Sequence, residues 1–218
     1  MSFKSILILT IGLWPKSSLK NTLLRVLGLK IKSKAKIGPN LFVNLKGVEI
    51  GENAVIRPFN VFRNVKIQLG NSSILGSWNW ISSARGLEKT ANYLGLLKIG
   101  DHSSINSRNY FDVSGGVIFG NFTDLAGVRS TFVTHQIDTE NSKQTCNLFK
   151  VGDYSMICSN SIIVPGGTRI GDRSIIAMGS VVTSGIYEDD SLYAGVPAKF
   201  KKKISGDWFH RTEGSVSG

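Results

Sequence analysis

The chain has 218 residues, 41% of them hydrophobic, and carries a formal net charge of +11. This length suits one domain with extensions, and no shift in composition marks a second globular core. The two cysteines, Cys146 and Cys158, are too few and too irregularly placed for a disulfide framework or a four-ligand zinc site, so the sequence predicts a reducing, cytoplasmic location.

Residues 1–36 differ from the rest of the chain. The apolar run over residues 6–14 is too short to cross a hydrocarbon core of roughly 30 Å as a helix. Ser17 or Ser18 is a candidate N-cap for a second helix that ends at Gly28. Two interpretations follow: the segment covers the open end of the fold that comes after it, or it makes a peripheral contact with a membrane surface.

Positive charge gathers toward both ends of the chain. No nucleic-acid-binding motif accompanies it, which argues against a nucleic-acid partner. An anionic ligand or an anionic membrane surface is the expected partner. The basic residues concerned are Lys16, Lys20, Arg25, Lys30, Lys32, Lys34 and Lys36 near the front, and Lys199, Lys201, Lys202 and Lys203 near the back.

Over residues 37–204 a large apolar residue tends to recur every six positions. Successive blocks open with Val151, Ile157, Ile163, Ile170, Ile176 and Val182. A six-residue unit supplies one short strand and a turn, and three units close a triangular coil that stacks on the next. The sequence therefore predicts an all-β parallel solenoid whose opening residues point inward. Residues 1–36 are expected to form a short helical or apolar cap, and residues 205–218 a flexible tail.

Two stretches interrupt the period and are expected to leave the solenoid as protruding loops, where function tends to be placed. They run from Ser83 to Lys98 and from Ile137 to Lys150. Within the second loop, Cys146 is expected to be exposed. Before the first loop, Trp78 and Trp80 should point outward, either to be covered by a neighbouring loop or subunit or to stack on a sugar face.

The repeat, the loop motif STFVTHQID and the ending SLYAGVPAKF together resemble the left-handed β-helix acyltransferases, which include maltose, galactoside, nodulation-factor and serine acetyltransferases. The resemblance spans about residues 37–204. It implies a left-handed coil, whereas the general preference for right-handed parallel crossovers would predict the other hand. It also implies acetyl-coenzyme A as the acyl donor, no required metal, and a homotrimer with active sites between subunits.

His135 is the candidate general base. A hydroxyl that attacks a thioester must lose its proton, and a neutral imidazole suits that task near neutral pH. The resemblance places the catalytic histidine in this setting, just before a protruding loop. Asp138 either accepts a hydrogen bond from the imidazole and fixes its tautomer, or caps the loop through its own backbone. His102 and His210 are expected to be structural.

The resemblance also implies positions for the two substrates. Asn106, with Asn109 as the less favoured choice, lies about one and a half coils before His135, close to where relatives bind the acceptor. Buried asparagine ladders are, however, also common in β-helices. Small residues of the last coils are expected to bind coenzyme A, with its phosphates near basic side chains beyond the last coil. These residues are Ser159, Ala177, Ser180, Thr183, Ser184, Pro197 and Lys199.

The chain departs from its relatives beside the donor positions. Where many relatives have Trp followed by Ile-Gly, this chain has Met156, Ile157 and Cys158. This puts the family's detail around the pantetheine in doubt. An acyl-cysteine intermediate on Cys158 is disfavoured, because no histidine or lysine is adjacent in sequence to lower the pKa of the thiol, and a small buried thiol packs well.

These features predict an acetyl-coenzyme A dependent O-acetyltransferase that acts on a sugar hydroxyl in surface-polysaccharide biosynthesis, such as capsule, O-antigen or exopolysaccharide. An amino-sugar N-acyltransferase on the same fold and a non-catalytic scaffold are the alternatives. A γ-type carbonic anhydrase is disfavoured, since its zinc needs three convergent histidines and His210 lies in the tail. The sequence leaves the acceptor and the acyl chain length open.

Overall fold

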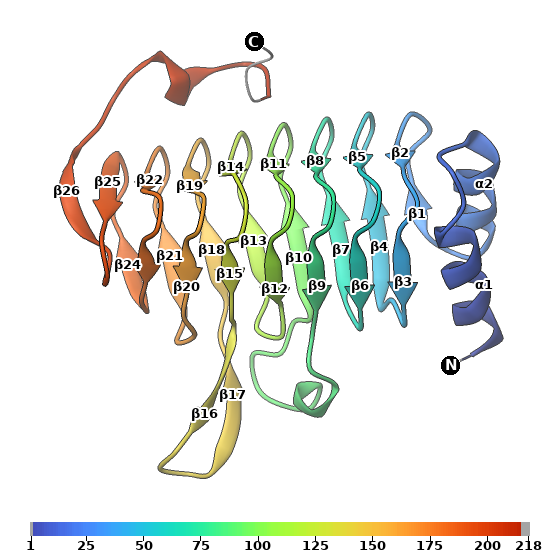
Figure 1. Cartoon of the computed structure of the whole chain (residues 1–218), viewed down its shortest axis with the longest axis horizontal. Coiled ribbons are helices and arrows are strands. Elements are labelled where there is room, and N and C mark those ends of the chain that lie inside the picture. The colour runs from blue at the N-terminus through green and yellow to red at the C-terminus, as the bar shows by residue number, and fades with distance from the viewer. Residues whose placement is uncertain (1, 215–218) are drawn as a thin grey trace.

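The chain folds into a left-handed parallel β-helix built from three sheets of short strands (Figure 1). The structure is a computed structural model and describes residues 2–214. Successive strands fall in the first, second and third sheet in turn, so three strands make one triangular coil. Each strand pairs in parallel with its counterpart one coil away. This architecture confirms the predicted solenoid.

The strands are as follows. The first sheet contains β1 (Lys30–Ile31), β4 (Gly47–Ile50), β7 (Lys66–Leu69), β10 (Leu96–Ile99), β13 (Val117–Phe119), β18 (Phe149–Val151), β21 (Thr168–Ile170) and β24 (Gly185–Tyr187). The second contains β2 (Lys36–Ile37), β5 (Val55–Ile56), β8 (Ile74–Leu75), β11 (Ser104–Ile105), β14 (Asp124–Ala126), β19 (Met156–Cys158), β22 (Ile175–Ile176), β25 (Ser191–Ala194) and, antiparallel at its edge, β26 (Lys199–Lys203). The third contains β3 (Leu41–Val43), β6 (Val61–Arg63), β9 (Trp80–Ser82), β12 (Tyr110–Asp112), β15 (Thr131–Phe132), β20 (Ile162–Ile163) and β23 (Val181–Val182).

The core runs along the inside of the prism. The opening residues of the last six blocks, from Val151 to Val182, are at most 1% exposed, so they point inward as predicted. Four phenylalanines fill the middle coils, where the Phe132 ring lies 4.6 Å from Phe111, 5.9 Å from Phe119 and 5.4 Å from Phe149, measured between ring centres. This aromatic cluster fixes the coils from which the second excursion leaves the solenoid.

Two helices, α1 (Phe3–Gly12) and α2 (Ser18–Val26), cover the N-terminal end of the solenoid (Figure 1). Of the two serines that the sequence offered as N-cap, Ser17 caps α2, its hydroxyl accepting a hydrogen bond from the backbone N–H of Lys20 at 3.1 Å. The first coil begins with β1, a few residues before the boundary expected at residue 37. None of the helices in residues 2–214 has the length and apolarity that a membrane span requires.

Lys20 joins the helical cap to the first coil. Its side chain is fully buried, and its Nζ donates hydrogen bonds to the carbonyl oxygens of Gly12 at 2.8 Å, Trp14 at 2.9 Å and Gly38 at 2.7 Å. Gly12 and Trp14 lie at the end of α1, where carbonyl groups lack partners within the helix. Burial disfavours the charged ammonium group and lowers the pKa of Lys20 to about 8.

Replacing Lys20 by methionine is expected to lower the free energy of unfolding by about 1–3 kcal/mol, because three buried carbonyl groups lose a donor while the volume of the side chain is nearly kept. Thermal and urea unfolding of the wild type and of Lys20→Met measure this difference. The exposed Lys98→Met change is the matched control and should leave the unfolding midpoint unchanged. Equal midpoints for wild type and Lys20→Met would show that Lys20 does not hold the cap.

The lowered pKa also gives this contribution a pH dependence. Between the folded pKa of about 8 and the unfolded value of 10.5, the unfolded chain binds more protons at Lys20 than the folded chain does. The contribution of Lys20 to the free energy of unfolding therefore rises as the pH increases through this window. In Lys20→Met this pH-dependent contribution to the free energy of unfolding is absent.

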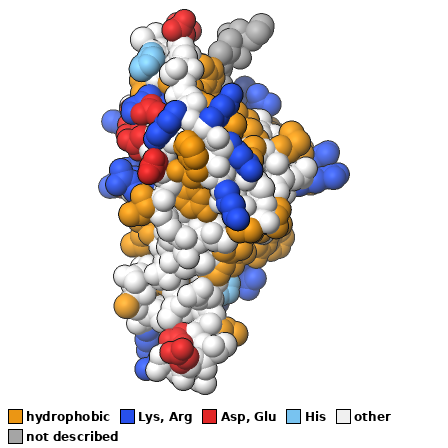
Figure 2. Space-filling view, turned by 90° about the vertical axis from the view of Figure 1, so that its left-hand side faces the viewer, with side chains coloured by type: hydrophobic (Ala, Val, Ile, Leu, Met, Phe, Trp, Pro, Cys, Tyr) orange, Lys and Arg blue, Asp and Glu red, His pale blue; other side chains and the backbone are white. Residues whose placement is uncertain are grey.

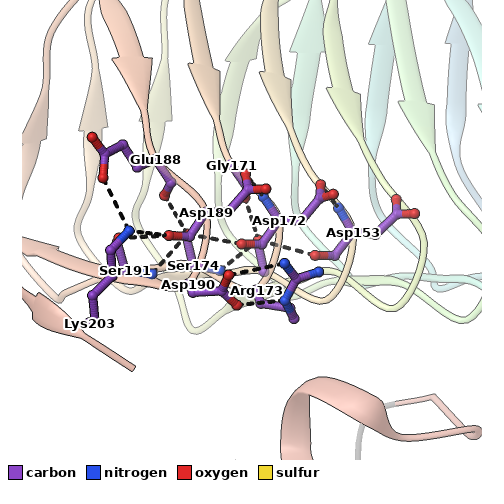
Figure 3. A network of polar contacts seen from close by, with 11 residues as sticks. Asp153, Gly171, Asp172, Arg173, Ser174, Glu188, Asp189, Asp190, Ser191 and Lys203 are labelled. Atoms are coloured by element: carbon purple, nitrogen blue, oxygen red, sulfur yellow. Dashed lines mark hydrogen bonds and ion pairs between the residues drawn. The ribbon is translucent and has the colours of Figure 1, made fainter. Parts of the chain in front are cut away.

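Hydrogen-bonded ladders fasten the coils at two corners of the prism. Between the first and second sheets, the backbone N–H of one coil donates to a side chain of the next coil, as in Asn121 to Asp153 at 2.8 Å. The same bond links Asp153 to Asp172 at 2.9 Å and Asp172 to Asp189 at 2.9 Å (Figure 3). We call this run the carboxylate ladder. Arg173 and Asp190 form an ion pair beside it at 2.6 Å.

The second ladder lies at the corner between the second and third sheets, and we call it the amide ladder. The Oδ1 atom of Asn40 accepts from the backbone N–H of Asn60 at 2.8 Å, and the same bond links Asn60 to Asn79 at 2.8 Å and Asn79 to Asn109 at 2.9 Å. Here the side chain of one coil holds the backbone of the following coil. Serines take over the position in the later coils, beginning with Ser130.

Both predicted excursions leave at the remaining corner, between the third and first sheets. The first contains the short 3₁₀-helix η1 (Arg85–Leu87) and rejoins the solenoid at β10. The second was expected as a loop from Ile137. It is instead a β-hairpin of β16 (His135–Asp138) and β17 (Lys143–Cys146), which starts two residues earlier and projects from the side of the solenoid (Figure 1).

The tail expected to be flexible lies back over the coils in its described part, residues 205–214. It contains the 3₁₀-helix η2 (Asp207–His210), and Figure 1 shows it running from β26 back toward the middle of the solenoid. The Arg211 guanidinium binds the carboxylate of Asp124 at 3.0 Å and lies 3.9 Å from the centre of the Trp208 ring. These contacts secure the tail to the turns of the middle coils. Residues 215–218 lie outside the described residues.

Candidate functional site

His135 lies where the hairpin leaves the solenoid. Two residues separate it from β15, and β15 is held by the Phe132 ring inside the core. On the hairpin side, His135 pairs with Cys146 at the base of the two strands. The imidazole is about one third exposed. The fold thus holds the backbone of His135 rigidly while its ring remains accessible from outside.

The imidazole forms a hydrogen bond to a buried carboxylate. His135 Nδ1 lies 2.7 Å from Oδ2 of Asp112, whose side chain is only 5% exposed. A carboxylate accepts and does not donate in its ionised form, so this contact places the ring proton on Nδ1. In residues 2–214 no hydrogen bond occupies Nε2, which is left as the basic nitrogen of a side chain that is about one third exposed. His135 and Asp112 therefore form a dyad with the geometry of a base and its orienting group.

Neighbouring groups hold Asp112 in this position. Its carboxylate accepts hydrogen bonds from the Ser114 hydroxyl at 2.6 Å, from the backbone N–H of Thr134 at 3.0 Å and from the Thr134 hydroxyl at 3.1 Å. Asp112 ends β12, one coil before β15, and Thr134 directly precedes His135. Coil stacking brings the carboxylate to the histidine across 23 residues of sequence.

The sequence suggested Asp138 as the orienting carboxylate of His135. This residue lies at the end of β16 that adjoins the hairpin turn. Its Oδ1 accepts from the backbone N–H groups of Glu140 at 3.1 Å and Asn141 at 3.2 Å, and its Oδ2 accepts from the Asn141 amide at 2.8 Å. These bonds lower the pKa of Asp138, with the side-chain bond from Asn141 as the main cause. Positions three apart in a strand face opposite sides, so Asp138 points away from His135 and caps the hairpin turn.

Cys146 is buried and Cys158 is partly buried, and both are free thiols. The prediction that Cys146 is exposed was wrong, since its side chain is 1% exposed and its Sγ lies 3.7 Å from the carbonyl oxygen of Ala91 in the first excursion. Burial raises the pKa of Cys146, and the nearby charge of Asp112 raises it further. Burial also raises the pKa of Cys158. Neither environment favours a nucleophilic thiolate.

The residues expected to bind the donor are divided between two corners. Ser159, Ala177 and Ser180 follow β19 and β22 at the corner of the amide ladder, and Pro197 follows β25 near the same corner. Thr183 and Ser184 follow β23 at the hairpin corner. The Oγ atom of Ser180 is buried and donates to Ala177 O at 2.7 Å, which assigns it to the coil itself. Lys199 is exposed at the start of β26.

One position at the corner of the amide ladder has a left-handed φ in six coils, and its side chain is large in the first four coils and small in the last two. The residues are Phe59, Trp78, Arg108, Arg129, Asn160 and Gly179. A Cβ atom added at Gly179 would meet nothing within 4 Å, so the surface at this position is open and a ligand can approach the backbone there.

The two candidate acceptor residues have different surroundings. The Asn109 side chain is 3% exposed and is a member of the amide ladder, with its Nδ2 donating to Asn106 O at 3.0 Å and its Oδ1 accepting from Ser130 N at 2.9 Å. This leaves it no free group for an acceptor. Asn106 is exposed at the same corner. His135 and Asn106 lie at different corners, so a single chain does not bring them together.

The outer face of the third sheet is apolar between these two corners. Trp80 and Tyr110 are neighbours in register and are 45% and 44% exposed, and Ile162 lies further along the same face at 45%. Trp78 points outward as predicted and packs on Phe59 with ring centres 4.7 Å apart. In residues 2–214 no cluster of three or more His, Cys, Asp or Glu side chains is arranged to hold a metal ion.

Comparison with known proteins confirms the resemblance found in the sequence. The family described as the hexapeptide repeat of succinyl-transferase matches residues 149–184. No curated protein matches the chain. Solved structures with the same fold include a hexapeptide-repeat acetyltransferase from Vibrio cholerae, with 24% identity, a TM-score of 0.51 and coverage of 64% of this chain and 74% of that one.

Two further structures share the fold. A maltose O-acetyltransferase from Clostridium difficile 630 has 23% identity and a TM-score of 0.52, over 64% of this chain and 70% of that one. A variant of AntD, an N-acyltransferase from Bacillus cereus, was solved in complex with dTDP and coenzyme A; it has 18% identity and a TM-score of 0.59, over 72% of this chain and 84% of that one. At these identities the likeness establishes the fold and leaves the reaction to the site itself.

Proposed function

We propose that the protein is an acetyl-coenzyme A dependent O-acetyltransferase that acts on a sugar hydroxyl, with His135 as the general base and Asp112 as its orienting carboxylate. The observation that carries this proposal is the 2.7 Å contact between His135 Nδ1 and Asp112 Oδ2 at the base of a projecting hairpin. The surface-polysaccharide pathway expected from the sequence remains part of the proposal, as does a cytoplasmic location, which fits two free thiols without a disulfide in the described chain.

The dyad supports direct transfer. His135 Nε2 accepts the proton of the acceptor hydroxyl as its oxygen attacks the carbonyl carbon of the thioester. A new C–O bond forms, the C–S bond breaks, and the proton held on Nε2 passes to the departing sulfur of coenzyme A. Asp112 stabilises the imidazolium that exists between these two proton transfers. The reaction needs no covalent enzyme intermediate, which agrees with the raised pKa values of Cys146 and Cys158.

We infer that two copies of the chain meet to bring the dyad to the donor, because most of the candidate donor positions lie away from the hairpin corner, with Thr183 and Ser184 as the exceptions. His135 lies at the hairpin corner, whereas Ser159, Ala177 and the open space at Gly179 lie at the corner of the amide ladder, on the other side of the third sheet. The apolar outer face of that sheet suits contact with a neighbour. We therefore propose a homotrimer in which the hairpin of one subunit meets the amide-ladder corner of the next.

The proposed reaction is tested by incubating the protein with acetyl-coenzyme A and a panel of free, nucleotide-linked and lipid-linked sugars, with products identified by mass. The expected product is a sugar ester that mild alkali removes. An alkali-stable amide would instead favour the amino-sugar N-acyltransferase, an alternative supported by the AntD fold match. Failure to bind acetyl-coenzyme A or to form any product would favour a non-catalytic scaffold.

The trimer predicts that two inactive variants restore activity when mixed. His135→Ala removes the base, and Ala177→Trp fills the amide-ladder corner, so each alone should be inactive. After unfolding and refolding of an equal mixture, about a quarter of the interfaces combine an intact His135 with an intact corner, which should return about a quarter of wild-type activity. Light scattering should report three chains per particle.

The control for this experiment is the mixture of the two variants without refolding, which should remain inactive if subunits do not exchange. A fully active monomer at the assay concentration would contradict the shared site. Refolded mixtures that contain trimers without any activity would show that each site uses residues of one chain only.

A further inference from the structure

Helix α1 is apolar on two sides, and the protein covers only one of them. Ile8 and Ile11 are buried against the coil, whereas Phe3, Ile6 and Leu13 are 76%, 49% and 51% exposed. The exposed positions fall at spacings of three and seven, which place them on one stripe of the helix. A helix that is apolar all round is normally covered on all sides. The outer stripe of α1 therefore indicates a partner.

Helix α2 has a similar outer surface. Leu24 faces inward without exposure, but Leu19 and Val26 are 60% and 79% exposed and lie seven positions apart on the outer side. Trp14, at the end of α1, is 39% exposed. The two helices pack on each other, so their outer residues belong to one end of the molecule. We refer to residues 2–28 as the cap.

The cap itself carries charge of one sign only, and the nearest acidic residue in sequence, Glu49, pairs with Lys30 at 2.8 Å. The first acidic residue of the chain is Glu49, whereas nine lysines and arginines precede it. Among these, Lys4 and Lys16 are exposed on the cap itself. The opposite end of the solenoid differs, because Figure 2 shows acidic and basic side chains side by side there, and Lys203 pairs with Glu188 at 3.1 Å. The cap thus combines exposed apolar residues with two exposed lysines, Lys4 and Lys16, that form no ion pair within residues 2–214.

We propose that the cap docks on the surface of an anionic lipid membrane. Its apolar outer residues enter the boundary between headgroups and acyl chains, and the surrounding lysines bind the anionic headgroups. A second copy of the chain is a poorer occupant, since two caps placed face to face bring together the same positive charge without any acidic partner. An amphipathic aromatic side chain such as Trp14 is suited to the membrane interface.

The arrangement of the fold gives this contact a defined orientation. Figure 1 shows α1 and α2 lying across the end of the solenoid, roughly perpendicular to its long axis. Helices that lie in the membrane plane therefore make the solenoid stand away from the membrane. If the proposed trimer has its solenoids parallel, three caps share one face and bind together, which strengthens the contact through effective concentration.

The test is sedimentation of the intact protein with two kinds of vesicle, one of phosphatidylcholine alone and one of phosphatidylcholine mixed with phosphatidylglycerol. Binding is expected only to the anionic vesicles, and it should fall as salt increases. The double change Lys4→Gln and Lys16→Gln should weaken binding about thirtyfold. The double change Phe3→Gln and Leu13→Gln should weaken it about a hundredfold. All four side chains are exposed, so the fold should persist, which circular dichroism checks.

Matched variants at the opposite end are the controls. Lys201→Gln with Lys202→Gln removes the same charge, and Ile186→Gln removes an apolar side chain that is 82% exposed. Both should bind anionic vesicles like the wild type. Loss of binding in these controls, or no binding by the wild type at moderate salt, would overturn the proposal. The proposal would also be overturned if light scattering showed that the protein assembles into a larger particle through its caps and that the cap variants abolish this assembly. These outcomes are independent of acetyl transfer and so are distinguishable from failure of the proposed function.

Discussion

Replacing His135 by alanine is expected to reduce turnover by about two to four orders of magnitude, the range in which a general base contributes to proton transfer. The binding of coenzyme A should be nearly unchanged, because most of the candidate donor positions, among them Ser159 and Ala177, lie at another corner of the prism. The fold should also persist, since the imidazole is partly exposed and its one hydrogen bond is to Asp112. Initial rates with the acceptor identified by mass, together with calorimetry of coenzyme A binding, measure both quantities.

His102→Ala is the control for this variant. His102 lies in a turn at the corner of the carboxylate ladder, where its ring stacks on Phe122 with centres 4.9 Å apart. Removing it should cost some stability near the tail but leave most of the turnover. If His135→Ala kept wild-type turnover, His135 would not be the general base, and the catalytic site would have to lie elsewhere on the fold.

Asp112→Asn is expected to lower turnover by a similar factor, because an amide in this place can donate to Nδ1 and so move the ring proton to Nε2, where it blocks base catalysis. The asparagine retains an oxygen for the Ser114 hydroxyl but clashes with the backbone N–H of Thr134, so some loss of stability is also expected. The rate per folded site, obtained from active-site titration, separates the two effects. The KM for acetyl-coenzyme A should change little.

Asp138→Asn provides the matched comparison. Asp138 is a carboxylate of the same hairpin, and its hydrogen bonds go to the turn at Glu140 and Asn141. The proposed dyad predicts nearly full turnover for this variant. If Asp138→Asn loses activity and Asp112→Asn keeps it, the orienting group is the one that the sequence suggested, and the hairpin must rearrange when substrates bind.

The repeat made the architecture predictable because its period is set by local geometry. Each block of six contains an inward residue, and residues such as Ile157 and Ile176 are buried as that period requires. The N-terminal helices were also predictable, since Ser17 and Gly28 bound the second one with ordinary capping signals. The hairpin was less predictable from the sequence. Its strands lack the alternating burial of a core, and only the break in the period indicated that the chain leaves the solenoid.

The partner of His135 was missed because it lies one coil away and not nearby in sequence. Asp138 was favoured through its distance of three positions, but a strand turns such a residue to the opposite side. A signal for Asp112 was present: it directly follows the inward Phe111, at a position that ends β12 in the coil below His135. A comparison of side chains at equivalent positions in neighbouring coils, and not only of neighbours in sequence, would have paired Asp112 with His135.

The two ladders described above act in opposite directions, and this affects how the molecule resists force. In the carboxylate ladder a side chain accepts a hydrogen bond from the backbone of the preceding coil, as Asp172 does from Asp153. In the amide ladder the side chain accepts from the backbone of the following coil, as Asn60 does from Asn79. Wherever both ladders run, detaching a coil from either end leaves one backbone N–H without its acceptor. The solenoid thus has no weak direction for unwinding. In a pulling experiment along the axis, the coils between the helical cap and the tail should detach with similar forces in either direction, which makes this part of the scaffold mechanically symmetric although its sequence is not.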